Sequence, residues 1–159
     1  VSGNIAGRVF VEILKAEFDW IVPKSCLIKP PAAQATALRP DVIVLDNEQL
    51  RFEPLWQKEP IICNGSTIKH VVEVVSTNWQ DDYARKVEEY AFLGIQEYWI
   101  IDFLGLGGLQ FIGKPKQPTF TVCQLIGDTY QQQQYRLGQN ITSNIFPNIR
   151  LKLDDLLPR

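Results

Sequence analysis

The sequence predicts an α/β fold in which a mixed β-sheet is flanked by helices and followed by a C-terminal antiparallel β appendage. Residues 69–76 contain four valines around Glu73, which is typical of a central strand covered on both faces. Apolar side chains recur at helical spacing over residues 84–91, and residues 97–102 are again strand-like. A strand, a helix and a strand within about thirty residues are typical of a parallel βαβ crossover.

The elements before this unit follow from the same patterns. Apolar residues at helical spacing over 5–14 predict an amphipathic helix. We expect short strands at 19–23 and 26–29, a loop at 32–38, an apolar strand at 41–45, and a loop with a helical turn over 46–66. Residues 78–82 offer N-cap chemistry for the crossover helix, and Gly94 ends it.

Glycines and prolines punctuate the chain beyond Asp102. They separate β-rich runs at 109–112, 119–125 and 130–136, which predict the antiparallel appendage, and residues 149–157 predict a final strand and a short helix. No repeat or linker divides the 159 residues, so we expect residues 1–159 to form a single domain. Because the chain opens at Val1 and contains no methionine, we expect residue 1 to lie inside a longer gene product.

The composition excludes several classes of protein. Hydrophobic residues make up 45% and charged residues 21%, as in a globular protein rather than a disordered chain. No apolar run approaches the roughly 18–20 residues of a membrane span. Sixteen Lys and Arg against eighteen Asp and Glu leave a net charge of −2, so contact with nucleic acid requires a local patch or metal ions. The cysteines form no CxxC pair, which favours three buried thiols in a reducing cytoplasm (Cys26, Cys63 and Cys123).

Two carboxylates stand alone in apolar strands. Asp41 opens the run Asp-Val-Ile-Val-Leu, and Glu73 divides Val-Val from Val-Val. Acidic side chains are seldom buried without a partner or a cation, and Mg²⁺ prefers hard oxygen ligands. Lys86 follows one helix later, one turn after Asp82, where an amine can hold a phosphate oxygen or position a water. With His70 as the single histidine, and more simply structural, Ser-His-Asp and Cys-His schemes lack a base.

Each of these residues also has a structural interpretation. Asp41 can cap a turn after Pro40, and Glu73 can form a structural salt bridge. Lys86 can be a solvated helix lysine paired with Asp82, which is itself suited to an N-cap or first-turn position.

Four ordered segments resemble the Uma family of endonucleases, which is abundant in cyanobacteria. They are Arg39-Pro40-Asp41 and residues 72–76, 82–90 and 94–102. The family belongs to the PD-(D/E)XK superfamily, so the resemblance implies a restriction-endonuclease-like core. It also implies a divalent-metal-dependent endonuclease, with Mg²⁺ or Mn²⁺ as cofactor and DNA, alternatively RNA, as partner.

The resemblance assigns roles residue by residue. Asp41 and Glu73 match the metal ligands, and the backbone carbonyl of Val74 matches a further ligand. Val75 occupies the lysine position of the motif, whereas family members carry that lysine on the following helix, which matches Lys86. A catalytically inactive nucleic-acid-binding or protein-interaction module on the same fold is the alternative. The net charge and the displaced lysine favour this alternative, and the retained carboxylates oppose it.

Apolar residues beside the glycines of the appendage favour self-association. Leu104, Leu106 and Leu109, together with edge strands, predict a homodimer, which the resemblance also implies. We expect Tyr98 and Trp99 to lie in the core.

Overall fold

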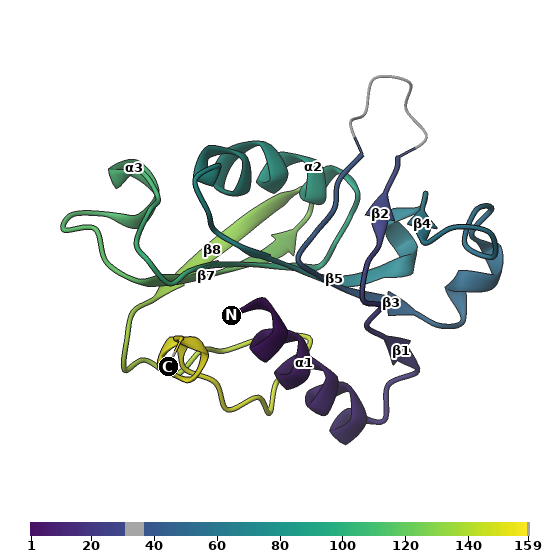
Figure 1. The fold of residues 1–159 in the computed structure, drawn as a ribbon, viewed down its shortest axis with the longest axis horizontal. Helices are drawn as coiled ribbons and strands as arrows, with labels where there is room; N and C mark the ends of the chain where they lie inside the picture. The colour runs from purple at the N-terminus through teal and green to yellow at the C-terminus, as the bar shows by residue number, and fades with distance from the viewer. Residues whose placement is uncertain (31–36, 159) are drawn as a thin grey trace.

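A six-stranded sheet forms the middle of the molecule in the computed structural model, which describes residues 1–30 and 37–158 (Figure 1). Its strands are β1 (Trp20–Ile21), β3 (Val42–Asp46), β5 (Ile68–Val74), β6 (Glu97–Asp102), β7 (Thr119–Ile126) and β8 (Thr129–Tyr135). Two further strands, β2 (Leu27–Ile28) and β4 (Ile61–Ile62), form a separate parallel pair. The helices are α1 (Ser2–Ala16), α2 (Lys86–Phe92) and α3 (Leu109–Ile112), and a π-turn (Asp81–Arg85) precedes α2. Short 3₁₀ turns cover Gln49–Phe52, Gly65–Thr67 and Leu153–Leu156.

The order of the strands confirms the predicted βαβ unit. The sheet runs β1-β3-β5-β6-β7-β8, with β5 and β6 parallel and every other neighbouring pair antiparallel. The β-branched run of β5 lies in the interior of the sheet, and the crossover from β5 to β6 passes through α2. Gly94 ends the crossover helix with φ 78°, a left-handed conformation that glycine adopts without steric cost.

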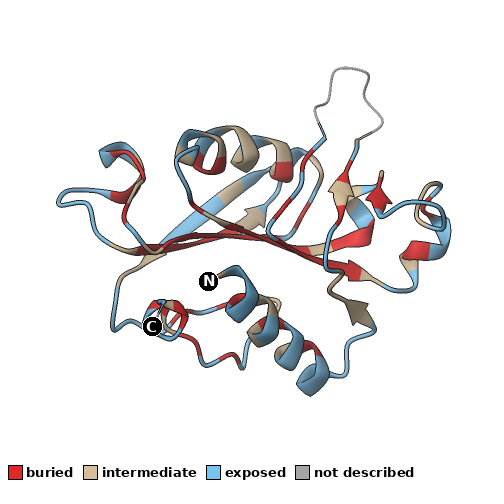
Figure 2. Ribbon diagram, viewed as in Figure 1, coloured by how far each residue is buried: buried red, intermediate tan, exposed pale blue. Residues whose placement is uncertain are grey.

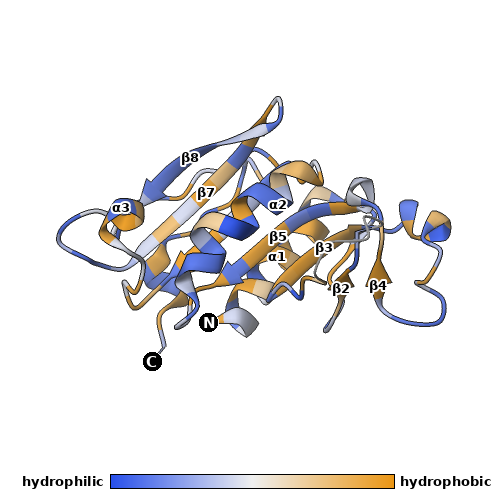
Figure 3. Cartoon of the chain, turned by 90° about the horizontal axis from the view of Figure 1, so that it is seen from above, coloured by the Kyte–Doolittle hydropathy of each residue, from blue (hydrophilic) through white to orange (hydrophobic). Residues whose placement is uncertain are grey.

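Two apolar layers enclose the sheet, whose inner strands β3, β5, β6 and β7 are buried along most of their length (Figure 2). On one face, Ile43, Val71 and Tyr98 pack against Tyr90 of α2. On the other, sheet residues such as Trp99 pack against α1 and the C-terminal segment. Figure 3 shows α2 lying over the hydrophobic strands of the sheet. Because side chains alternate along a strand, residues 41, 43 and 45 face α2, as do 71, 73 and 75.

The antiparallel strands predicted after residue 118 are present. β7 and β8 pair with each other, and residues 119–124 of β7 also pair with the whole of β6. The appendage therefore extends the central sheet and forms one of its edges.

Some local predictions are wrong. Residues 109–112 form the single-turn helix α3 instead of a strand, and residues 149–152 form no strand although the predicted short helix follows as a 3₁₀ turn. The prediction missed β4, which pairs with β2. Most of the loop predicted at 32–38 lies outside the described residues. Cys63 is only partly buried, unlike the other two free cysteines.

Candidate active site

The two predicted carboxylates lie together on the face of the sheet that α2 covers. Val42 of β3 pairs with Val72 of β5, which places Asp41 beside Glu73. The backbone N–H of Asp41 donates a hydrogen bond to Glu73 Oε1 at 3.3 Å. The N–H of Val74 donates to Asp41 Oδ2 at 2.6 Å. Glu73 is only 2% exposed and lies in the core, whereas Asp41 is exposed to solvent.

The helical segment after β5 brings Lys86 to the same place. Its Nζ lies 2.9 Å from Glu73 Oε2 and 3.0 Å from Asp82 Oδ1. The Lys86 side chain is 20% exposed, and Asp82 is buried. Lys86 is therefore not a solvated helix lysine; it links two acids from different elements. Val75, at the usual lysine position of the motif, is buried in the apolar layer beneath α2.

Tyr90 is a site residue that the sequence did not reveal. Its hydroxyl donates a hydrogen bond to Glu73 Oε2 at 2.7 Å, and the residue is fully buried against Tyr98. Its helical spacing predicts a core position, which is correct, but spacing alone does not show where the hydroxyl points.

Burial and charge shift the pKa values of these groups. Burial, helped by the charge of Asp41, raises the pKa of Glu73 to about 7, although Lys86 and Tyr90 act to lower it. Burial also raises the pKa of Asp82. Burial alone would lower the pKa of Lys86, but the charge of Glu73 and hydrogen bonds to both acids raise it instead. Three carboxylates against one ammonium leave the cluster negative when all are ionised, which favours binding of a cation.

Two carboxylate oxygens of the pair are left without a strong hydrogen bond among the described residues. Glu73 Oε1 accepts only the long bond from Asp41, and Asp41 Oδ1 has no partner among the described residues. Glu73 Oε2, in contrast, is already held by Tyr90 and Lys86. Two hard carboxylate oxygens suit Mg²⁺ when waters or phosphate oxygens complete the shell. Within residues 1–30 and 37–158, no three His, Cys, Asp or Glu side chains group as a metal cluster.

Burial of a carboxylate does not by itself mark this site. Glu53, Glu97 and Asp102 are also buried, and each is satisfied by N–H and O–H donors. Within the described part of the chain, none of the three forms an ion pair, whereas Glu73 does. The pairing with Lys86 and the proximity of Asp41 therefore distinguish Glu73.

The sequence model of one family, Uma2, whose description is "Putative restriction endonuclease", matches residues 1–154. The chain belongs to the Uma2 family. This confirms the predicted family and, with the mixed sheet and its flanking helices, the restriction-endonuclease-like fold. Comparison with the curated proteins gives no match.

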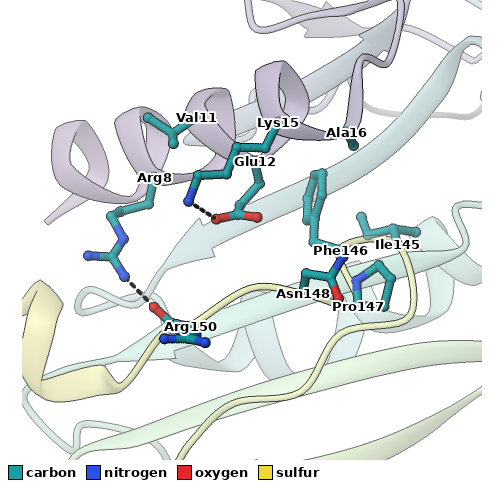
Figure 4. Close-up of a pocket in the computed structure, with 10 residues that line it drawn as sticks. All are labelled: Arg8, Val11, Glu12, Lys15, Ala16, Ile145, Phe146, Pro147, Asn148 and Arg150. Carbon is teal, nitrogen blue, oxygen red and sulfur yellow. Dashed lines mark hydrogen bonds and ion pairs between the residues drawn. The ribbon is translucent and has the colours of Figure 1, made fainter.

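Two further features of this Uma2 protein lie away from the site. His70, buried against Trp99, donates a hydrogen bond from Nδ1 to the carbonyl oxygen of Glu97, which fits a structural role. A cavity of about 650 Å³ separates α1 from the loop at 145–150, with Arg8, Lys15 and Arg150 among its lining residues (Figure 4). It lies on the α1 face and includes none of the candidate site residues.

No helix in the described ranges has the length and apolar character to span a bilayer.

Proposed function

We propose that this Uma2 protein is a Mg²⁺- or Mn²⁺-dependent endonuclease that hydrolyses phosphodiester bonds in DNA. The family match supports a nuclease at a coarse level. The observation that supports the finer proposal is the convergence of Asp41, Glu73 and Lys86, from three elements, at the exposed end of a buried cluster.

Each residue has a distinct role in this proposal. Asp41 and Glu73 hold the ion through Asp41 Oδ1 and Glu73 Oε1, with the carbonyl of Val74 as a further ligand. The ion, when bound, is a Lewis acid that stabilises negative charge on the phosphate in the transition state. The Lys86 ammonium has three N–H donors, of which Glu73 and Asp82 occupy two. Its third donor is available to a phosphate oxygen or to the attacking water.

Supercoiled plasmid incubated with increasing Mg²⁺ or Mn²⁺ tests the proposal. Cleavage should depend on the ion, and Asp41→Ala and Glu73→Ala should abolish it because each removes a ligand that no neighbour replaces. Glu88→Ala, which changes an exposed acid on α2, is the matched control and should cleave at the parent rate. Val75→Lys should restore some activity to Lys86→Ala, since it returns an amine to the usual motif position.

A module that binds nucleic acid or protein without cleaving is the second candidate, favoured by the net charge of −2. Binding of plasmid without cleavage at any ion concentration would support it and contradict the nuclease. Preference for structured RNA over plasmid in the same assay would change the substrate and leave the chemistry intact.

We further propose that residues 1–159 act as a single domain, as a homodimer, in the cytoplasm. Packing of α1 and the C-terminal segment on one sheet supports the single domain. Leu104 and Leu109, 62% and 51% exposed, support self-association because exposed apolar groups favour contact with another surface. Three unpaired thiols support a reducing compartment.

A further inference from the structure

Asp82 is held in place through both its backbone and its side chain. Its carbonyl oxygen accepts a hydrogen bond from the Tyr98 hydroxyl of β6 at 2.9 Å, and its Oδ1 accepts one from Lys86 Nζ at 3.0 Å. Asp82 belongs to the π-turn, in which the N–H of Lys86 bonds to the carbonyl of Asp81. A helix is distorted where a side chain inserts into its hydrogen-bond ladder, and π-turns are frequent at functional sites. The hydrogen bond from the Tyr98 hydroxyl joins this turn to the sheet and so fixes the position of Asp82.

Lys86 needs a partner other than Glu73. A lysine side chain is flexible, and Glu73 shares its negative charge with any cation bound at its other oxygen. The attraction between Glu73 and the Lys86 ammonium is therefore weaker when the cation is bound, which is the state in which the ammonium has to be in position. Asp82 is buried on the Lys86 side of the cluster, and its carboxylate oxygens accept hydrogen bonds from no described residue except Lys86.

We propose that Asp82 is a positioning residue that keeps the Lys86 ammonium beside Glu73 and directs its third N–H outward, toward the substrate phosphate. Asp82 itself holds neither the ion nor the substrate. The inference rests on the proposed nuclease function for its catalytic consequence, but the placement of Lys86 by Asp82 is testable without any cleavage.

Chemical labelling of Lys86 in the metal-free protein tests the placement. Acetylation with an amine-reactive reagent, followed by mass spectrometry, reports how readily Lys86 leaves its two partners and loses its proton, because only the neutral amine reacts. Asp82→Asn should raise the labelling rate of Lys86 several-fold. Glu89→Gln is the matched control, because it removes an acid of α2 that pairs at 3.0 Å with Arg85, the last residue of the π-turn, rather than with Lys86. Should Lys86 in Asp82→Asn react at the parent rate, the proposal is wrong.

A second variant covers the possibility that Asp82→Asn does not fold. Tyr98→Phe keeps the buried ring and removes only the hydroxyl that bonds the Asp82 carbonyl. It should raise Lys86 labelling by a smaller factor. If Asp82→Asn cannot be made and Tyr98→Phe leaves the labelling rate unchanged, the proposal is overturned.

A double-mutant cycle on plasmid cleavage tests the consequence. Asp82→Asn should lower kcat by roughly 10–100-fold, as for other groups that orient a site residue, with KM for DNA nearly unchanged. In the Lys86→Ala background the same change should have no further effect, because its target is gone. An equal fall in both backgrounds, or none in either, would overturn the proposal. If the parent protein does not cleave, the proposed function fails and the labelling result alone decides the placement.

Discussion

Replacing Glu73 with glutamine should stabilise the metal-free protein at alkaline pH. Burial, together with the charge of Asp41, raises the pKa of Glu73 from 4.5 to about 7. A carboxyl group with a higher pKa in the folded state binds its proton more tightly there. Its contribution to stability is therefore complete below pH 4.5 and is lost as the pH rises through about 7. A difference of one pKa unit between the folded and unfolded states corresponds to about 1.4 kcal/mol, so the loss of stability amounts to about 3 kcal/mol.

Urea denaturation in EDTA, across this pH range, measures the effect. The difference in free energy of unfolding between Glu73→Gln and the parent isolates Glu73, because His70 and the other titrating groups are common to both proteins. That difference should change by up to about 3 kcal/mol in favour of the variant between pH 4.5 and 8. Glu88→Gln, on the exposed side of α2, should show no such change. A difference that stays flat across the range would refute the reasoning from burial.

Magnesium should reverse the order of stability. A ligand that binds only the folded state adds about 2.7 kcal/mol at a hundred times its Kd. We expect this gain for the parent protein and none for Glu73→Gln, which lacks the anionic ligand. Equal stabilisation of both proteins by Mg²⁺ would place the ion elsewhere.

Four other predictions follow from named contacts. Burial lowers the pKa of His70 to about 4, so its contribution to stability is complete above pH 6.5 and lost as the pH falls toward 4; NMR of this single imidazole should show no titration above about pH 5. Lys86→Ala should slow cleavage by about 10²–10³-fold while calorimetry finds metal affinity nearly unchanged, because it removes charge stabilisation in the transition state. Light scattering should give twice the protomer mass, and a value of 18.2 kDa at micromolar concentrations would contradict the dimer. Gly65→Ala would place a Cβ 1.9 Å from the carbonyl oxygen of Leu93, so the melting temperature should fall, in line with overpacking costs of about 1–3 kcal/mol.

The sequence predicted the βαβ unit well because its signals are long and mutually consistent. The valine run of β5, the helical spacing that includes Tyr90, and Gly94 each favour the same arrangement. The errors fall on short segments. Residues 109–112 are apolar whether they form a strand or one helical turn, and four residues are too few for periodicity to decide. The two residues of β4 give no pattern at all.

The candidate site was predictable only in part, for a physical reason. Isolation in an apolar run correctly indicated a buried carboxylate at Glu73 but not at Asp41, which is exposed, and it does not show what satisfies the charge. Glu97 begins the apolar strand β6 and Asp102 ends it. Backbone and hydroxyl donors satisfy both carboxylates. The hydroxyl of Tyr90 and the placement of Asp82 depend on how α2 lies over the sheet, which no local pattern specifies.

The apolar layer beneath the sheet joins two distant parts of the chain. Ile5, Val9 and Ile13 of α1 pack in one cluster with residues between Ile141 and Leu156. During synthesis α1 leaves the ribosome long before these partners exist, so the part of its apolar stripe that they cover stays exposed until the C-terminal segment is made. Domains with such late partners are exposed to premature association, and chaperones act on surfaces of this kind. The residues of the candidate site, from Asp41 to Tyr98, are all synthesised before the C-terminal segment that completes the opposite face.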